Sequence, residues 1–186
     1  LDFDTARTRT AYERIISDFE KGKTQILIGT QMLSKGLDFG NVSVVGILSA
    51  DSLMNFPDFR AHERAYQLMV QVSGRAGRRD KRGTVILQTT QPEHPLIRMV
   101  QHFAYKEMVS LQLSERSMFR YPPYYRLIVL ILRSRNEEAL QEMSALYAEK
   151  LRARLGERVL GPVTPPITRV QTLHIKTVSY THLTLP

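Results

Sequence analysis

The sequence predicts an α/β fold with a parallel sheet, followed by a second, α+β domain. Three short apolar runs, residues 25–29, 42–50 and 83–90, are expected to be buried strands, and the run 42–50 is rich in Val and Ile and bounded by turn residues. Residues 60–73 lie between the second and the third run and have apolar side chains at helical spacing. A helix between two buried strands favours parallel pairing in a layered sheet. The proline-rich joint Tyr121–Tyr124 then separates this part from the rest of the chain.

The composition indicates a globular protein with a polyanionic partner. The chain has 186 residues, of which 42% are hydrophobic and 24% charged, and its net charge of +8 favours a partner such as nucleic acid. Because it has no cysteine, it contains neither a disulfide framework nor a Cys-ligated zinc. No apolar run reaches the roughly 18 residues of a membrane span, so we expect no membrane partner. Since the sequence begins at Leu1 without Met, we expect a fragment of a longer protein.

The first segment predicts a helix followed by a strand. Apolar residues recur at helical spacing from Thr5 to Lys21, which predicts an amphipathic helix ending near Gly22. Residues 25–29 are typical of a short buried strand. The intervening Gly-Lys-Thr at residues 22–24 is no phosphate-binding loop, because it ends a helix and opens a strand, and Ser17 stands where the motif requires glycine.

Polar residues and a glycine follow the predicted strand in the segment 29–39. Thr30 and Gln31 can hydrogen-bond a backbone phosphate or a sugar, and Gly36 allows the main chain to approach a ligand closely. Asp38 can accept from a hydroxyl or an arginine. This placement at the carboxyl end of a strand favours a ligand site, with an ordinary glycine turn as the alternative.

The segment 51–60 contains a proline and is expected to be irregular around it. Its Phe56 and Phe59 could stack on bases or pack onto the neighbouring helix, and the sequence leaves both open. His62-Glu63 resembles half of a zinc-protease motif, but Tyr66 occupies the position of the second histidine. We therefore predict no metal site there.

Residues 71–78 form a basic, glycine-containing stretch at the end of the predicted helix 60–73. Arg75 and Arg78 can direct two guanidinium groups at one small polyanion, while Gly74 and Gly77 keep the backbone unobstructed. The alternative is a basic helix end that complements the helix dipole. The stretch thus favours phosphate binding without establishing it.

The middle of the chain predicts one long helix that leads to a domain boundary. Residues 96–113 have amphipathic spacing and are expected to form a single helix. His94 lies between prolines in the turn before it and is expected to be a turn residue rather than a catalyst. Because Tyr121–Tyr124 contains two consecutive prolines, we place a domain boundary there.

The last part predicts a β-α unit, a loop and a further strand. Residues 125–132 are expected to form a strand, and Asn136 can cap the helix after it. Prolines mark residues 161–166 as a loop, and residues 170–175 are expected to form another strand. The apolar face of the helix is predicted to consist of Leu140, Met143, Tyr147, Leu151 and Leu155.

Residues 29–39 and 71–78 together resemble motifs V and VI of superfamily 2 helicases, in the order found on the second RecA-like lobe. With several further segments, the chain is similar over residues 1 to about 176 to the PriA family of primosomal replication-restart helicases. The resemblance implies a RecA-like helicase lobe 2 with a partial parallel sheet, followed by a truncated α+β C-terminal domain. The segments that carry it are GTQMLSKGLDF, PDFRA, QVSGRAGR, QTTQPEHP, YPPY and LGPVTPP.

This resemblance also implies a domain order. Residues 1–95 would form the helicase lobe, residues 96–120 a helical connector and residues 121–177 the start of a DNA-binding C-terminal domain. Residues 178–186 resemble a translated sequencing adaptor, and we expect this tail to be disordered or arbitrarily placed.

By resemblance, the polar and glycine residues of the two motifs divide into three groups of site residues. The first group faces ATP bound on another lobe, with Arg78 and Arg75 as arginine fingers. The second contacts the nucleotide and couples it to the DNA track, and the third contacts DNA. These groups are Gln71, Arg75 and Arg78 (catalytic); Gly36, Asp38, Gly74 and Gly77 (cofactor-binding); and Thr30, Gln31 and Lys35 (nucleic-acid-binding).

The activity implied by the resemblance is that of a cytoplasmic, ATP-dependent 3′-to-5′ DNA helicase that reloads the replication machinery at stalled forks. Its cofactor would be ATP with Mg²⁺, bound mostly by a lobe absent from this sequence, and zinc would belong to an upstream part. Its partners would be forked and single-stranded DNA, primosome proteins and single-stranded-DNA-binding protein. Since the sequence contains no Walker A loop, we expect the chain alone to be inactive. The alternatives are a RecG-like translocase and a non-catalytic basic α/β module that binds nucleic acid.

Overall fold

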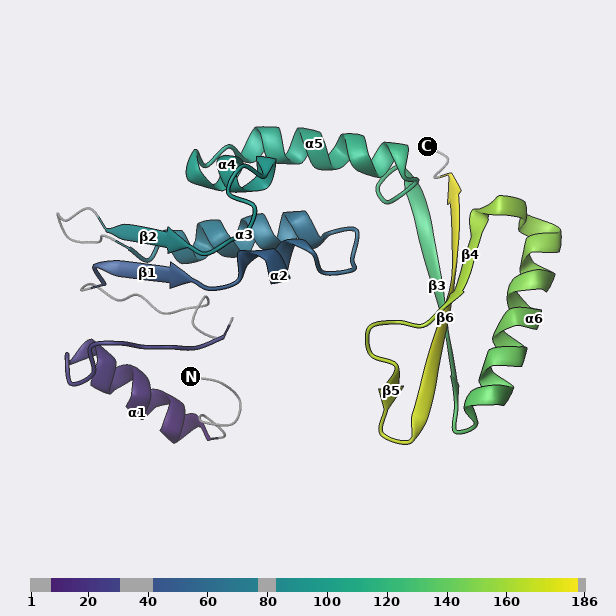
Figure 1. The fold of residues 1–186 in the computed structure, drawn as a ribbon, viewed down its shortest axis with the longest axis horizontal. Helices are drawn as coiled ribbons and strands as arrows, with labels where there is room; N and C mark the ends of the chain where they lie inside the picture. The colour runs from purple at the N-terminus through teal and green to yellow at the C-terminus, as the bar shows by residue number, and fades with distance from the viewer. Residues whose placement is uncertain (1–7, 31–41, 77–82, 184–186) are drawn as a thin grey trace. The chain divides into compact units, whose positions relative to one another are not determined.

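The fold was taken from a computed structural model, which describes residues 8–30, 42–76 and 83–183 (Figure 1). The chain divides into two compact units, Leu1–Val109 and Ser110–Pro186. This division falls inside the expected connector 96–120, while the four-part domain order itself remains a prediction. None of the helices in the described ranges is long and apolar enough to cross a membrane.

The first unit opens with the expected amphipathic helix, α1 (Arg9–Glu20). The Thr8 side chain caps it by accepting from the Ala11 backbone N–H at 3.2 Å. Ile16 is its buried residue, and the chain leaves the helix through Gly22, whose φ of 71° suits a glycine. The prediction of this helix is confirmed.

The strand predicted at residues 25–29 does not form. Ile26 is 78% exposed and Ile28 is 72% exposed, so the apolar run is not buried. A strand is stabilised by the ladder that it makes with a neighbour, and among the described residues no strand pairs with this segment. The prediction was wrong because local composition does not specify a pairing partner.

The parallel sheet is confirmed by β1 (Val44–Ile47) and β2 (Thr84–Leu87), which pair in parallel from Val44 opposite Thr84 to Ile47 opposite Leu87. Both strands are shorter than predicted. The short helix α2 (Ala50–Met54) follows β1 directly, so the irregular segment before Pro57 begins only at Asn55.

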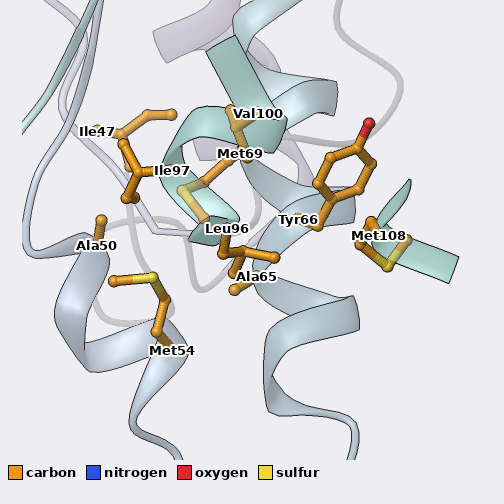
Figure 2. Packing of buried hydrophobic residues seen from close by; sticks show 10 residues of the cluster. All are labelled: Ile47, Ala50, Met54, Ala65, Tyr66, Met69, Leu96, Ile97, Val100 and Met108. Carbon is orange, nitrogen blue, oxygen red and sulfur yellow. The ribbon is translucent and has the colours of Figure 1, made fainter. Parts of the chain in front are cut away.

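Helix α3 (Ala61–Ser73) connects the two strands, as the spacing predicted. Tyr66, the residue that broke the metal motif, is 4% exposed, and Met69 is fully buried. Figure 2 shows how side chains from β1, α2, α3 and the following two helices form one core. Its buried members are Ile47, Ala50, Met54, Ala65, Tyr66, Met69, Leu96, Ile97, Val100 and Met108.

The single helix expected at 96–113 is instead two helices, α4 (Pro95–Gln101) and α5 (Tyr105–Met118). The His94 ring accepts from the Leu96 backbone N–H at 3.1 Å and caps α4, which confirms its role in the turn. Phe103 has a φ of 52° and ends α4 in a left-handed conformation. Apolar spacing continues across this break, so periodicity alone did not reveal it.

The second unit contains an antiparallel sheet in the order β3-β6-β4, with a short strand paired to β6. One long helix, α6, packs on one face of the sheet. Asn136 caps this helix as predicted, because its side chain accepts from the Ala139 backbone N–H at 3.0 Å. The elements are β3 (Tyr125–Ser134), α6 (Glu137–Leu155), the 3₁₀ turn η2 (Gly156–Arg158), β4 (Val159–Val163), β5 (Arg169–Val170) and β6 (Leu173–Leu183).

The apolar face predicted for α6 is only partly correct. Leu140 is buried as expected, but Met143 and Tyr147 are 54% and 50% exposed. Ser144 and Ala148 are buried instead, each with no exposed surface. These two residues are small and weakly hydrophobic, so a prediction from hydrophobicity alone favoured the larger side chains.

Of two expectations for the end of the chain, one was partly wrong and the other was wrong. Residues 161–166 were expected to be a loop, but Gly161 and Pro162 lie in β4, and the loop begins only at residue 164. The tail 178–186 was expected to be disordered or arbitrarily placed, but β6 continues through it to Leu183 and pairs with β3. Alternating apolar and polar residues suit a strand with one covered face, which explains the pairing physically. The adaptor origin of the tail remains a prediction.

Truncating Met69 tests whether this core holds the first unit together. Because the Met69 side chain is fully buried, we expect Met69→Ala to lower the free energy of unfolding by about 2–5 kcal/mol. Chemical denaturation followed by circular dichroism measures the change. Met118→Ala is the matched control, since Met118 is 71% exposed, and equal stability of both variants would contradict the packing.

Candidate functional site

Because β1 and β2 pair in parallel, both strands of the first unit's sheet begin at one edge and end at the other. Val44 and Thr84 begin the two strands side by side, and the Thr84 N–H donates to the Ser43 carbonyl at 2.9 Å. In the sequence, the segments 31–41 and 77–82 lead into these strand starts. We call this side the amino edge and the side where the strands end the carboxyl edge.

Helix α3 carries the basic stretch back toward the amino edge, because β2 begins there. Gln71 is exposed in its last turn, Gly74 caps the helix, and half-buried Arg75 follows. The Gly74 N–H donates to the Val70 carbonyl at 3.0 Å. An amide and a guanidinium at a helix end are donor groups that fit a phosphate, and the same placement also complements the helix dipole.

The backbone around Gly74 does not itself require glycine. Its φ is −65°, and among the described residues a Cβ added there would meet only the carbonyl oxygens of Gln71 at 3.6 Å and Val70 at 3.7 Å. These are ordinary van der Waals contacts. If alanine at this position impairs function, the cause must therefore be a ligand or another part of the protein that approaches the main chain.

The structure places only some of the predicted site residues. Gln71, Gly74 and Arg75 are brought together at one helix end, and Thr30 is exposed at the end of a described range. Their predicted roles remain predictions. The residues that lie outside the described ranges are Gln31, Lys35, Gly36, Asp38, Gly77 and Arg78.

A hydrogen-bonded cluster at the carboxyl edge was not indicated by the sequence. The Asp51 carboxylate accepts from the Thr89 hydroxyl at 2.5 Å, and from the Thr90 backbone N–H and hydroxyl, both at 2.8 Å. Next to it, the Ser49 N–H donates to the Gln88 side chain at 3.2 Å. These contacts join the start of α2 to the segment after β2, and no local pattern relates residues 38 or 39 positions apart.

The same cluster sets the acidity of Asp51. The hydrogen bond from the Thr89 hydroxyl is the largest cause of a pKa below the ordinary 3.8, and those from Thr90 act in the same direction. The ionised carboxylate is therefore the form that holds the two segments together. Asp51 is best described as a residue that fixes the carboxyl edge.

Two histidines also lie near this edge. The rings of His62 on α3 and His94 before α4 meet edge to face, with centroids 5.4 Å apart. In the part of the chain that the structure describes, no group of three His, Cys, Asp or Glu residues could hold a metal ion. The histidine pair therefore contributes packing between two helix starts.

Comparisons with known proteins relate both units to one kind of protein. Residues 3–80 match the helicase conserved C-terminal domain, and residues 117–182 match the primosomal protein N C-terminal domain. The chain is similar to the replication restart protein PriA of Bacillus subtilis, at 44% identity over 177 residues that cover 92% of this chain and 22% of the relative. It is 40% identical over 173 residues to that of Synechocystis sp. and 37% identical over 170 residues to that of Treponema pallidum. These alignments cover 91% and 90% of this chain, and 21% and 26% of the relatives. The chain thus spans about a fifth to a quarter of the length of these relatives.

The Asp51 cluster makes a testable prediction about acid stability. Because its folded-state pKa lies below 3.8, its stabilisation is present above that value and is lost as the pH falls through the folded pKa. We expect Asp51→Asn to be less stable than the parent at pH 7, with the difference shrinking below pH 3.8. Urea midpoints across this pH range measure it, with exposed Glu13→Gln as a control. A pH-independent difference would show that the charge is not involved.

Proposed function

Because the chain belongs to the PriA family of replication restart proteins, we propose that it is part of an ATP-dependent DNA helicase that reloads the replication machinery at stalled forks. The observation that carries the proposal is the succession of a helicase C-terminal domain and a primosomal protein C-terminal domain in one chain. Relatives that bear the name replication restart protein PriA are 36–44% identical over most of the chain, which supports the same assignment.

In this proposal the first unit supplies arginines to an ATPase site completed by another lobe. Bound ATP with Mg²⁺ supplies the phosphoanhydride whose hydrolysis drives movement. Charge spreads over the transferred phosphoryl oxygens, and a guanidinium stabilises it at a rate gain on the order of 10³ to 10⁵. Arg78 and Arg75 are the proposed fingers, and Gln71 the amide beside them. Arg75 and Gln71 fit this role because they share one helix end.

We assign coupling to DNA to the motif at residues 29–39. Gly36 and Asp38 would link the nucleotide to the DNA track, and Thr30, Gln31 and Lys35 would contact the strand. When the lobes close on ATP and reopen after hydrolysis, alternating grip on one strand gives directional movement, proposed to be 3′ to 5′. The sequence contains no Gly-x-x-x-x-Gly-Lys-Ser/Thr loop, so the chain by itself should not hydrolyse ATP.

Zinc does not fit the residues of this chain. The sequence has no cysteine, and the described ranges contain no cluster of metal ligands. Any zinc of the whole protein would be held by other residues, and no step here depends on it. We propose forked and single-stranded DNA, primosome proteins and single-stranded-DNA-binding protein as partners, and the cytoplasm as the location.

A non-catalytic, basic nucleic-acid-binding module is the second candidate, favoured by the net charge of +8. A RecG-like translocase is less well supported, because residues 117–182 match a primosomal protein domain. Sequencing the gene upstream of Leu1 separates these candidates. A P-loop and an acidic Mg²⁺-binding motif there support the helicase, and their absence from the whole gene would leave the binding module.

Replacing Arg78 tests the arginine-finger role. In a hybrid where this chain replaces the matching part of the Bacillus subtilis relative, we expect Arg78→Lys to lower DNA-stimulated ATP hydrolysis by about a hundredfold or more. Lysine keeps the charge but cannot reproduce the planar fork, so DNA binding should be nearly unchanged. Arg14→Lys on exposed α1 is the control. Full ATPase activity in Arg78→Lys would remove Arg78 from catalysis.

Thr30 is expected to act on coupling rather than on hydrolysis itself. In the same hybrid, Thr30→Ala removes a hydroxyl proposed to contact a DNA phosphate. We expect a higher DNA concentration for half-maximal ATPase stimulation, with little change in the rate without DNA. A titration with single-stranded DNA measures both quantities, and Thr30→Ser should restore the parent behaviour. An unaltered DNA dependence would count against this assignment.

A further inference from the structure

The loop between α2 and α3, residues 55–60, lies toward the carboxyl edge of the sheet, whereas the end of α3 that carries Arg75 lies toward the amino edge. The chain leaves β1 at its carboxyl end, forms α2 and this loop, and returns along α3 toward the amino edge (Figure 1). With 13 residues, α3 separates the two ends by roughly 20 Å. This loop is therefore not part of the proposed ATPase site.

The loop presents aromatic rings and guanidinium groups together. The Phe56 ring is 53% exposed, so one face of it is available to a ligand. The Arg60 guanidinium lies 5.2 Å from the centre of the Phe59 ring, within the range of a cation–π contact. The sequence left open whether the two rings pack inward, and the structure shows Phe56 on the surface and Phe59 half-buried.

One carboxylate holds the basic groups in place. Asp58 accepts from the Arg64 guanidinium at 2.8 Å and from the Arg60 backbone N–H at 2.8 Å, and the Arg60 side chain lies 3.8 Å from it. The side chains of Arg60 and Arg64 nevertheless remain 48% and 52% exposed. Glu63 in the first turn of α3 balances the second arginine, so the site rests on the exposed guanidinium groups, which have five N–H donors each, and not on a local excess of positive charge.

This combination fits a single nucleic-acid strand better than an apolar protein surface. A strand presents base faces, which stack on exposed rings, and phosphates, which bind guanidinium groups. An apolar partner would cover the exposed parts of the two guanidinium groups without supplying acceptors for their N–H groups, which is costly. The chain's net charge of +8 also favours a nucleic acid as the partner.

We propose that Phe56, Arg60 and Arg64 form a contact site for single-stranded DNA, in which Phe56 stacks on a base and the arginines donate to flanking phosphates. The inference rests on the proposed function, that the protein acts on DNA, and adds a site outside the two helicase motifs. Helix α3 then begins at a DNA contact and ends at the arginines proposed to face ATP.

Replacing Phe56 tests stacking in the 186-residue chain. The probe is a fluorescently labelled oligothymidylate, and binding is measured by anisotropy at low salt. We expect Phe56→Ala to weaken binding on the order of tenfold, Phe56→Leu to be equally weak, and Phe56→Trp to match the parent. Phe103→Ala, which removes another exposed ring of the same unit, is the control and should bind normally. Parent-like affinity in Phe56→Leu would overturn stacking.

The salt dependence of binding tests the arginines. Loss of one phosphate contact lowers the slope of log affinity against log salt by roughly 0.7 for a single strand. We expect this decrease in Arg60→Ala and in Arg64→Ala. Arg98→Ala is the matched control for Arg64, because Arg98 is also an exposed arginine paired with a carboxylate, that of Glu93, and its slope should not change. Circular dichroism confirms that each variant is folded.

The possible outcomes separate this site from the proposed function. Parent-like binding by both Phe56→Ala and Arg64→Ala overturns the site, while the Arg78→Lys ATPase measurement still decides the helicase assignment. Equal affinity for a duplex of the same length, with equal dependence on Phe56, also overturns it, because paired bases are not available to stack. Failure of the parent chain to bind oligothymidylate overturns the site as well.

Discussion

The parallel ladder between β1 and β2 is the constraint on which the rest of the first unit depends. Parallel strands start at one edge and end at the other, so the intervening chain must cross the whole sheet to return. That crossing is α3, and the core residues beneath it hold its direction. The ladder thus determines which segments meet at the amino edge and which at the carboxyl edge. The ionised Asp51 carboxylate fixes the second edge through Thr89 and Thr90.

The packing of α3 bears on the proposed function. Its first turn carries Arg64 and follows the exposed loop, while Gln71 lies in its last turn and Arg75 just beyond it. Met69 and Tyr66, both buried, anchor the middle of the helix in the core. Under the proposed function, this packed helix is the element that would connect the DNA contact with the arginine end. This geometry would suit a protein whose DNA grip and ATP hydrolysis must change together.

The sequence predicted most elements of regular structure but not all of their limits. Periodicity identified α1, α3 and α6, and Val/Ile-rich runs identified β1 and β2, because these patterns report burial on one or both faces. The prediction of a strand at residues 25–29 failed because a strand needs a neighbouring strand to pair with, and local composition does not specify that neighbour. The prediction of one helix over residues 96–113 failed at Phe103, because a residue in the left-handed conformation can end a helix without changing the apolar spacing of the sequence. The face of α6 differs from the predicted one because Ala148, a small residue, is fully buried in the cluster that it forms with Val159 and Val178 of the sheet.

The sequence indicated the part of the candidate site whose residues are close in sequence and gave no signal for the part whose residues are distant. Arginines and glycines a few positions apart favour phosphate binding, and this role remains a prediction. The Asp51 cluster gave no such signal, since its partners lie 38 and 39 positions away and only the sheet brings them together. Gly74 shows the complementary case, because its αR backbone and its contacts with the described residues would accept a Cβ. These residues give no reason for a glycine, so the reason has to be sought in a ligand or chain segment that approaches the end of α3.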